Sequence, residues 1–244
     1  MVLHTLNEIR EALRRLTVQQ RSTVELWLQE LDGIPAPANE VREALPAYAD
    51  LDSAFMTLEE FFAFEQKTPV RHEFINGVLF AMNGASVNHS RIIRNLTIAI
   101  VAHLKHGPCE VFQSGLKAVV RRDVNEIAYY PDVFVDCRPD TRDTHYVRDP
   151  KLIVEVLSPS TLIIDQREKL QNYRLIDSVE EYVLIAEDER RVIVYPRAER
   201  WKPRVYGDID AAIELRSIDL TVPLTDLYAD VVLSEQVAHA DQSL

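Results

Sequence analysis

The sequence predicts an α/β sandwich built on a mixed sheet of about five to seven strands. Residues 128–136 and 151–157 are dense in Val, Ile, Leu and Phe on both faces, as expected for buried central strands. Residues 88–104 and 165–177 carry apolar side chains at helical spacing. Helices that alternate with fully apolar strands are typical of a sheet covered by helices.

The 244-residue chain divides into two parts. Residues 1–33 carry two runs with helical apolar spacing, and residues 34–52 are rich in Pro, Ala and acids, as a linker would be. We therefore expect a helical extension with its linker over residues 1–50 and a main domain over residues 51–244. Two such short helices bury little surface alone, so they should pack on the main domain or on a partner.

The main domain should begin with a helix, a hairpin and a longer helix. Thr57 can cap a short helix, with Glu60 at the capping-box position. Asn76-Gly77 lies between two short apolar runs and predicts a tight hairpin. A helix should then run from Asn88 to about residue 104 and end before Gly107-Pro108.

Strands dominate the rest of the main domain. We expect them at residues 111–120, 128–136 and 151–157, followed by the helix at 165–177 and a hairpin of residues 182–186 and 191–195. There is no GxGxxG and no GxxxxGK[ST] motif, so the sequence gives no support to dinucleotide or P-loop binding.

Composition restricts the compartment and the partners. Two cysteines are too few for a disulfide framework or a four-thiolate zinc site and are typical of a reducing cytoplasm. No apolar run approaches the ~20 residues that a membrane helix needs, so we expect a soluble cytoplasmic protein without a membrane partner.

Charge opposes a general affinity for nucleic acid. The net charge of -12 means that such binding must rest on a local basic groove or on metal ions. Five basic residues could form that groove or could equally belong to a solvated face: Arg91, Arg94, Lys117, Arg121 and Arg122.

Three acids occupy unusual places in predicted strands. Glu155 interrupts an apolar strand, Asp132 opens a strand after Pro131, and Glu73 leads into the hairpin. If folding brings them together, they need a cation, and hard oxygen donors select Mg²⁺ or Mn²⁺, with the Val156 carbonyl as a further donor. Each acid also has an ordinary alternative: an arginine partner for Glu155, a turn for Asp132 and a half-exposed strand position for Glu73.

One helix face adds a lysine to these acids. Asp165, Lys169 and Tyr173 are four residues apart and share a face. Lys169 could point toward Glu155, where an ammonium can orient a water or offset transition-state charge. A capping box and an ion pair within the helix would explain Asp165 and Lys169 without any chemistry.

A single histidine joins the candidate residues. His89 begins the 88–104 helix, where it could contact a phosphate or a carboxylate, or simply cap the helix. No HxxxH, HExxH or CxxC spacing occurs, so a zinc site is not expected.

Four motifs together resemble a known family. RHEFINGVLFAMNGAS, YYPDVFVDC, KLIVEVLSPST and DQREKLQNY occur in the order found in the Uma-two family of proposed restriction endonucleases, in the PD-(D/E)xK nuclease superfamily. The resemblance covers about residue 56 to the C-terminus and implies a restriction-endonuclease-like α/β/α sandwich. It implies that Asp132 and Glu155 are the metal-binding acids, that Lys169 replaces the lysine usually found at the position of Leu157, that Glu73 is an additional acid and that Asp165 supports them.

These observations lead to three hypotheses. The first is a Mg²⁺-dependent endodeoxyribonuclease in which an activated water attacks a DNA phosphate in line, with Glu73, Asp132, Glu155 and Lys169 as catalytic residues. The second is a catalytically silent module of the same fold that binds protein or nucleic acid. The third is a nuclease that acts on RNA or on a small nucleotide. The resemblance and the expected edge strands also suggest a homodimer.

Overall fold

The computed structural model describes residues 56–233, apart from residues 83, 114, 123–124, 139–142 and 159–167. The predicted helical extension and linker over residues 1–50 lie outside the described residues, as does Asp165. Among the described helices, none is both long and apolar enough to cross a membrane.

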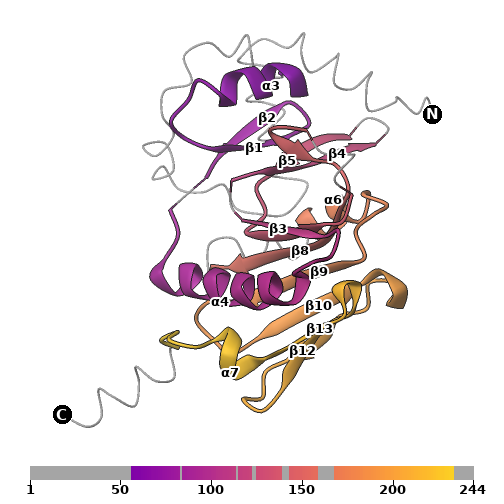
Figure 1. The fold of residues 1–244 in the computed structure, drawn as a ribbon. Helices are drawn as coiled ribbons and strands as arrows, with labels where there is room; N and C mark the ends of the chain where they lie inside the picture. The colour runs from indigo at the N-terminus through magenta and orange to yellow at the C-terminus, as the bar shows by residue number, and fades with distance from the viewer. Residues whose placement is uncertain are drawn as a thin grey trace, which may run out of the picture.

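The first layer is a five-stranded sheet covered by a helix (Figure 1). Its strand order is β2-β1-β5-β4-β7, with bounds Val78–Ala81, His72–Ile75, Asn125–Tyr129, Lys117–Arg122 and Tyr146–Val147. Helix α3, Leu58–Glu65, packs Leu58 and Phe61 against Phe74 on the outer face. Its capping box forms as predicted, because Thr57 Oγ1 accepts from the Glu60 N–H and Glu60 Oε2 accepts from the Thr57 N–H.

The predicted hairpin is confirmed in this sheet. Strands β1 and β2 pair antiparallel, with Ile75 opposite Val78. Asn76 and Gly77 both have positive φ, at 49° and 98°, which is the backbone that a two-residue hairpin turn requires.

The second layer is a mixed six-stranded sheet, within the predicted size. Its order is β11-β10-β9-β8-β6-β3, with bounds Arg204–Tyr206, Val192–Pro196, Glu181–Ala186, Pro150–Leu157, Val133–Asp136 and Glu110–Gln113. Strands β8 and β9 are parallel and the other neighbours are antiparallel. The predicted α/β fold with a mixed central sheet is therefore confirmed.

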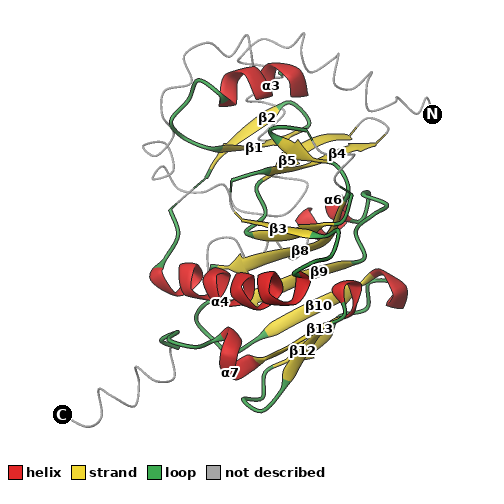
Figure 2. Cartoon of the chain, in the orientation of Figure 1, coloured by secondary structure: helices red, strands yellow, loops and turns green. Residues whose placement is uncertain are grey.

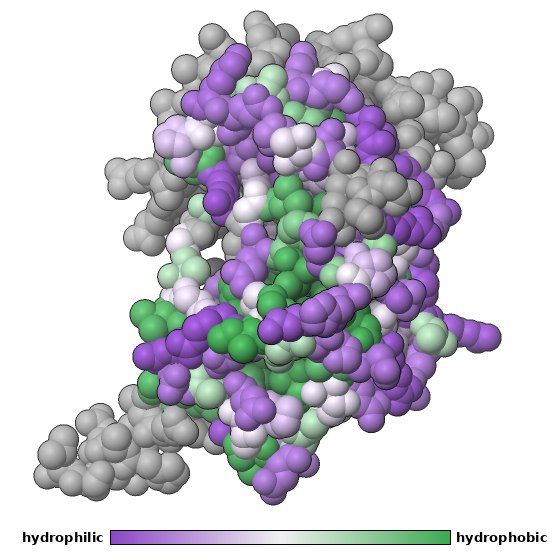
Figure 3. Space-filling view, viewed as in Figure 1, coloured by the Kyte–Doolittle hydropathy of each residue, from purple (hydrophilic) through white to green (hydrophobic). Residues whose placement is uncertain are grey.

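The two sheets pack face to face, and further elements cover the outer face of the second sheet (Figures 1 and 2). Between the sheets lie side chains such as Tyr129, Phe134 and Ile153. The outer face carries helix α4, Val87–Leu104, the hairpin of β12, Ala212–Leu215, and β13, Leu220–Pro223, and helix α7, Leu224–Leu227. On the face drawn in Figure 3, hydrophobic residues gather at mid-height, between the first sheet and α4.

Two strands that the sequence predicts as continuous are each divided between the sheets. The predicted strand at 111–120 becomes β3 in the second sheet and β4 in the first, with Gly115 between them. The predicted strand at 128–136 becomes β5 and β6, and Pro131 lies at the division. Proline has no N–H for a ladder, so the chain leaves one sheet here and enters the other.

The helix predicted at 165–177 ends earlier than expected. Residues 165–167 lie outside the described residues, and helix α6, Leu170–Tyr173, is followed by turns. The reason lies in Arg197, at the start of the 3-10 turn Arg197–Glu199, whose guanidinium donates to the carbonyls of Arg174, Ile176 and Val179. These bonds stabilise turns in place of further helix. The other predicted helix, α4, begins one residue early because Ser86 caps it through the His89 N–H.

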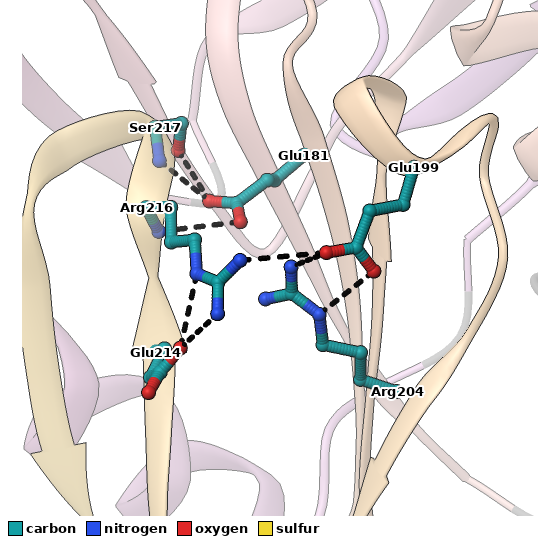
Figure 4. Close-up of polar contacts among 6 residues, drawn as sticks. All are labelled: Glu181, Glu199, Arg204, Glu214, Arg216 and Ser217. Carbon is teal, nitrogen blue, oxygen red and sulfur yellow. Dashed lines mark hydrogen bonds and ion pairs between the residues drawn. The ribbon is translucent and has the colours of Figure 1, made fainter.

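A buried carboxylate fastens the β12–β13 hairpin to the second sheet (Figure 4). Glu181 on β9 accepts from the N–H groups of Arg216 and Ser217 and from the Ser217 hydroxyl, within the 3-10 turn Arg216–Ile218. Glu181 is 2% exposed, so these donors replace the water that the carboxylate loses.

The two cysteines are joined to each other. Cys109 and Cys137 form a disulfide beside the antiparallel strands β3 and β6. The sequence indicated two cysteines typical of a reducing compartment and gave no sign of this pairing, which arises because the strand register sets the two residues opposite each other.

Candidate active site

Two of the predicted acids lie at one end of a pair of neighbouring strands. Strands β6 and β8 pair Val133 with Val154; Asp132 directly precedes β6, and Glu155 follows Val154 on β8. Both carboxylates line the same cleft. The Val156 N–H donates to Asp132 Oδ2 at 2.7 Å and fixes that carboxylate at the strand end.

Glu155 is a nearly buried carboxylate with two donors on one oxygen. Its side chain is 5% exposed, and Oε1 accepts from Lys169 Nζ at 3.2 Å and from the Tyr173 hydroxyl at 2.9 Å. Burial, reinforced by the negative charge of Glu155, raises the pKa of Tyr173 well above its ordinary value. The phenol therefore keeps its proton and acts as a donor to Glu155.

Lys169 connects the two sheets through their acids. Its Nζ lies 2.9 Å from Glu73 Oε1, on β1 of the first sheet, as well as 3.2 Å from Glu155 Oε1 on β8 of the second. The ammonium also lies 5.2 Å from the centre of the Tyr129 ring. Lys169 precedes α6, so this short helix sets the position of the ammonium between the two carboxylates.

His89 contacts the carboxylate of Asp132. Its Nε2 lies 3.2 Å from Asp132 Oδ2. Burial opposes protonation of the ring, but hydrogen bonding and charge from Asp132, the charge of Glu187 and the Val156 backbone outweigh it, so the pKa of His89 is raised. Nδ1 of the same ring is buried and has no hydrogen-bond partner among the described residues.

All these side chains except Tyr129 and Tyr173 line one cleft of about 1100 Å³ between the β1–β2 hairpin and α4. Its lining combines charged and other polar side chains with aromatic and aliphatic ones. The lining residues that carry charge or can hydrogen bond through an imidazole are Arg71, Glu73, His89, Arg94, Asp132, Glu155, Lys169 and Glu187.

The donor set fits a hard cation in one arrangement. Among the described residues, no three His, Cys, Asp or Glu side chains converge as a ready-made metal site. Asp132 and Glu155 line the cleft together, and the Val156 carbonyl lies beside the His89 ring. Two carboxylates and a carbonyl, with waters in the other positions, match the oxygen donors that Mg²⁺ and Mn²⁺ prefer.

The predicted basic groove is only partly formed. Arg94 lines the cleft, and Arg91 lines an adjoining hollow of about 380 Å³ at the start of α4. The other three do not line the cleft: Arg121 pairs with Glu59 and Glu126, Arg122 pairs with Asp177, and Lys117 is buried near the rings of Phe61, Phe62 and Tyr130.

Two further lining residues, Arg71 and Phe80, have a signal in the sequence. The hairpin register pairs Glu73 with Phe80, and Arg71 lies two residues before Glu73. Counting outward from the Asn76-Gly77 turn predicts that Phe80 shares the face of Glu73.

Fold and cleft define a restriction-endonuclease-like α/β protein with an acidic, lysine-containing site. The chain belongs to the Uma2 family, described as "Putative restriction endonuclease", whose model matches residues 58–225. The predicted family resemblance is therefore confirmed.

Two relatives and one solved structure are similar to the chain. The chain is 33% identical over 173 residues to the uncharacterized protein slr1290 of Synechocystis sp., covering 70% of this chain and 90% of that one. It is 32% identical over 145 residues to the uncharacterized protein sll1609 of the same organism, covering 58% and 81%. Its fold is similar to that of a "putative nuclease belonging to DUF820" from Anabaena variabilis, with a TM-score of 0.59, 20% identity and coverage of 72% and 99%.

Proposed function

We propose that this protein is a metal-dependent nuclease that hydrolyses phosphodiester bonds of DNA. The observation that carries the proposal is the meeting of Glu73, Asp132, Glu155 and Lys169, from four separate segments, in one cleft. Membership of a family described as restriction endonucleases supports the same class of reaction.

Asp132, Glu155 and the Val156 carbonyl would hold the cation in this proposal. A bound Mg²⁺ or Mn²⁺ supplies Lewis acidity toward a phosphoryl oxygen and makes a water more acidic. The chain's own residues orient these ligands: the Val156 N–H and His89 hold Asp132, and the Tyr173 hydroxyl holds Glu155.

In this proposal Lys169 acts on the attacking water and on the phosphate. Its ammonium, held between Glu73 and Glu155, can donate to the attacking water or offset the charge that develops on the phosphorane oxygens. Near-complete burial of Lys169 and Glu155 strengthens this electrostatic interaction, because little water screens it.

Plasmid cleavage tests the proposal. Supercoiled plasmid incubated with the purified protein and Mg²⁺ or Mn²⁺ should be nicked or linearised, and Asp132→Ala should abolish this. Asp177→Ala is the matched control, because Asp177 is an exposed acid paired with Arg122 outside the cleft. Equal activity of wild type and Asp132→Ala would remove the proposal.

A second candidate, a catalytically silent module of the same fold, has one observation in its favour. Leu157 stands where the superfamily lysine is usual, and no three acidic or imidazole side chains converge among the described residues. Calorimetric titration with Mg²⁺ separates the two, because a silent module gives no heat that depends on Asp132 and Glu155.

We also propose a homodimer. In the described part of the chain, β2 and β7 are the edge strands of the first sheet and β11 and β3 those of the second, which supports pairing through an edge. A dimer would present two sites to the two strands of DNA. Sedimentation velocity gives the oligomeric state directly, and a monomer at micromolar concentration would exclude this part of the proposal.

A further inference from the structure

Phe80 is an aromatic side chain exposed beside the acids of the cleft. It lies on edge strand β2 directly opposite Glu73, so both side chains stand on the face of the hairpin that lines the cleft. The residue is 49% exposed. A ligand that covers this ring therefore needs an apolar face for the ring and a charged group compatible with the rest of the cleft.

Two arginines line the same cleft as this ring. Arg71 precedes Glu73 by two residues and lines the cleft, with its guanidinium 5.6 Å from the centre of the Tyr130 ring. Arg94 lines the cleft from α4, with a half-exposed side chain. Its ion pair with Asp230 is a surface pair, which a phosphate can displace at little cost.

The adjoining hollow extends this surface along α4. It shares Ser86, Ser90 and Arg94 with the cleft and adds Arg91. With a net charge of -12, most of the protein repels a polyanion, so these arginines determine where phosphates can lie.

The chemistry of this surface distinguishes single strands from duplexes. Phosphates suit the arginines, but a phenylalanine ring can stack only on a base whose face is uncovered. In a duplex the base faces are covered by their neighbours. A single strand presents them, and stacking on an aromatic residue is tolerant of sequence.

We propose that this cleft binds a single-stranded segment of DNA, with one base stacked on Phe80 and flanking phosphates on Arg71 and Arg94. The inference rests on the proposed function, because it names the substrate class of the same site. It assigns to Phe80 the selection of unpaired over paired DNA.

Fluorescence anisotropy with a labelled mixed-sequence oligonucleotide, single-stranded or annealed as a blunt duplex, tests this inference. Each titration is run in EDTA and again with CaCl₂, which supplies a hard cation. Wild type should bind the single strand more tightly, and Phe80→Ala should weaken single-strand binding about 10-fold while duplex binding stays nearly constant. Phe80→Trp should retain the preference.

Matched controls isolate the cleft. Val205→Ala removes an exposed apolar side chain, 62% exposed, from edge strand β11 and should leave affinity unchanged. Arg71→Ala with Arg94→Ala should weaken binding and lower its dependence on salt, whereas Arg121→Ala should not. Thermal melting confirms that each variant is folded.

Three results overturn the inference: equal single-strand affinity of wild type and Phe80→Ala, preference for the duplex, or no single-strand binding in either buffer. A change in oligomeric state on Phe80→Ala without a change in DNA affinity would assign Phe80 to a subunit interface and also overturn it. Failure of this inference can be distinguished from failure of the nuclease proposal, which plasmid cleavage tests. Phe80-dependent binding without cleavage removes only the nuclease, and Asp132-dependent cleavage with unaltered Phe80→Ala binding removes only this inference.

Discussion

Glu155 and Glu181 are two buried glutamates on neighbouring parallel strands of one sheet, and they have opposite surroundings. They are 3% and 2% exposed. Glu181 uses both carboxylate oxygens to accept from two backbone N–H groups and a hydroxyl (Figure 4). Glu155 accepts on Oε1 from an ammonium and a phenol and lines the cleft.

The difference shows that burial alone does not identify a functional acid. Donors fixed in the backbone satisfy Glu181 inside the protein and fasten a turn to the sheet. Glu155 instead accepts from two side chains and lines a cleft, where a ligand can reach it. Five experiments test these two acids and the groups around them, in order of decreasing effect.

The largest effect should come from Glu155→Gln. Loss of the carboxylate removes a proposed metal ligand and the anionic partner of Lys169, so we expect plasmid cleavage to fall by about 100-fold or more. Glu181→Gln should cleave at the wild-type rate under conditions where it is folded. Equal losses in both variants would abolish the distinction between the two glutamates.

Stability should show the reverse order. Glu181→Ala leaves buried N–H groups without an acceptor, and we expect the free energy of unfolding to fall by about 3 kcal/mol in urea denaturation. Glu155→Gln keeps the size of the side chain and an acceptor oxygen and should lose less. A larger loss for Glu155→Gln would mean that Glu155 is the structural acid.

Tyr173→Phe should have an intermediate effect. It removes one hydrogen bond to Glu155 Oε1 without changing the packing of the ring, at a cost of about 1 kcal/mol in the free energy of unfolding. We also expect a modest fall in cleavage, because Glu155 loses a group that orients it. Tyr195→Phe, on a half-buried ring of β10, is the control and should leave cleavage unchanged.

His89 should titrate above the ordinary histidine pKa. Burial lowers the pKa of His89, but Asp132, Glu187 and the Val156 backbone together raise it more. Because the folded-state pKa is raised, the contribution to stability is complete below the ordinary histidine pKa and is lost as the pH rises through the raised value. An NMR titration in EDTA measures this pKa, and Asp132→Asn should lower it; an unchanged value would contradict the contact.

The smallest effect should come from Arg216→Ala. Its guanidinium is exposed and pairs with Glu214 and Glu199 at the surface (Figure 4), so the free energy of unfolding should change by less than about 0.5 kcal/mol. The backbone bond from Arg216 to Glu181 survives this substitution. A loss as large as that of Glu181→Ala would show that the side chain, and not the backbone, fastens the turn.

Local patterns predicted those parts of the molecule that depend on neighbouring residues. Thr57 with Glu60, and Asn76 with Gly77, each act over two to four residues, and both the cap and the hairpin formed as predicted. Gly115 and Pro131 can be read in the sequence, but the change of sheet at each of them cannot. Strand pairing depends on segments far away in the chain. Glu181 was overlooked because an acid at the start of a strand is ordinary.

The sequence by itself determined the main elements and the family, and it drew attention to Glu73, Asp132, Glu155 and Lys169 as acids and a lysine in unusual positions. Their catalytic roles remain predictions. Only the tertiary structure decided that Lys169 joins Glu73 to Glu155, that His89 contacts Asp132 and that Phe80 faces the same cleft. The physical reason is that these contacts cross between two packed sheets, and side chains from distant segments meet only when the whole core is assembled.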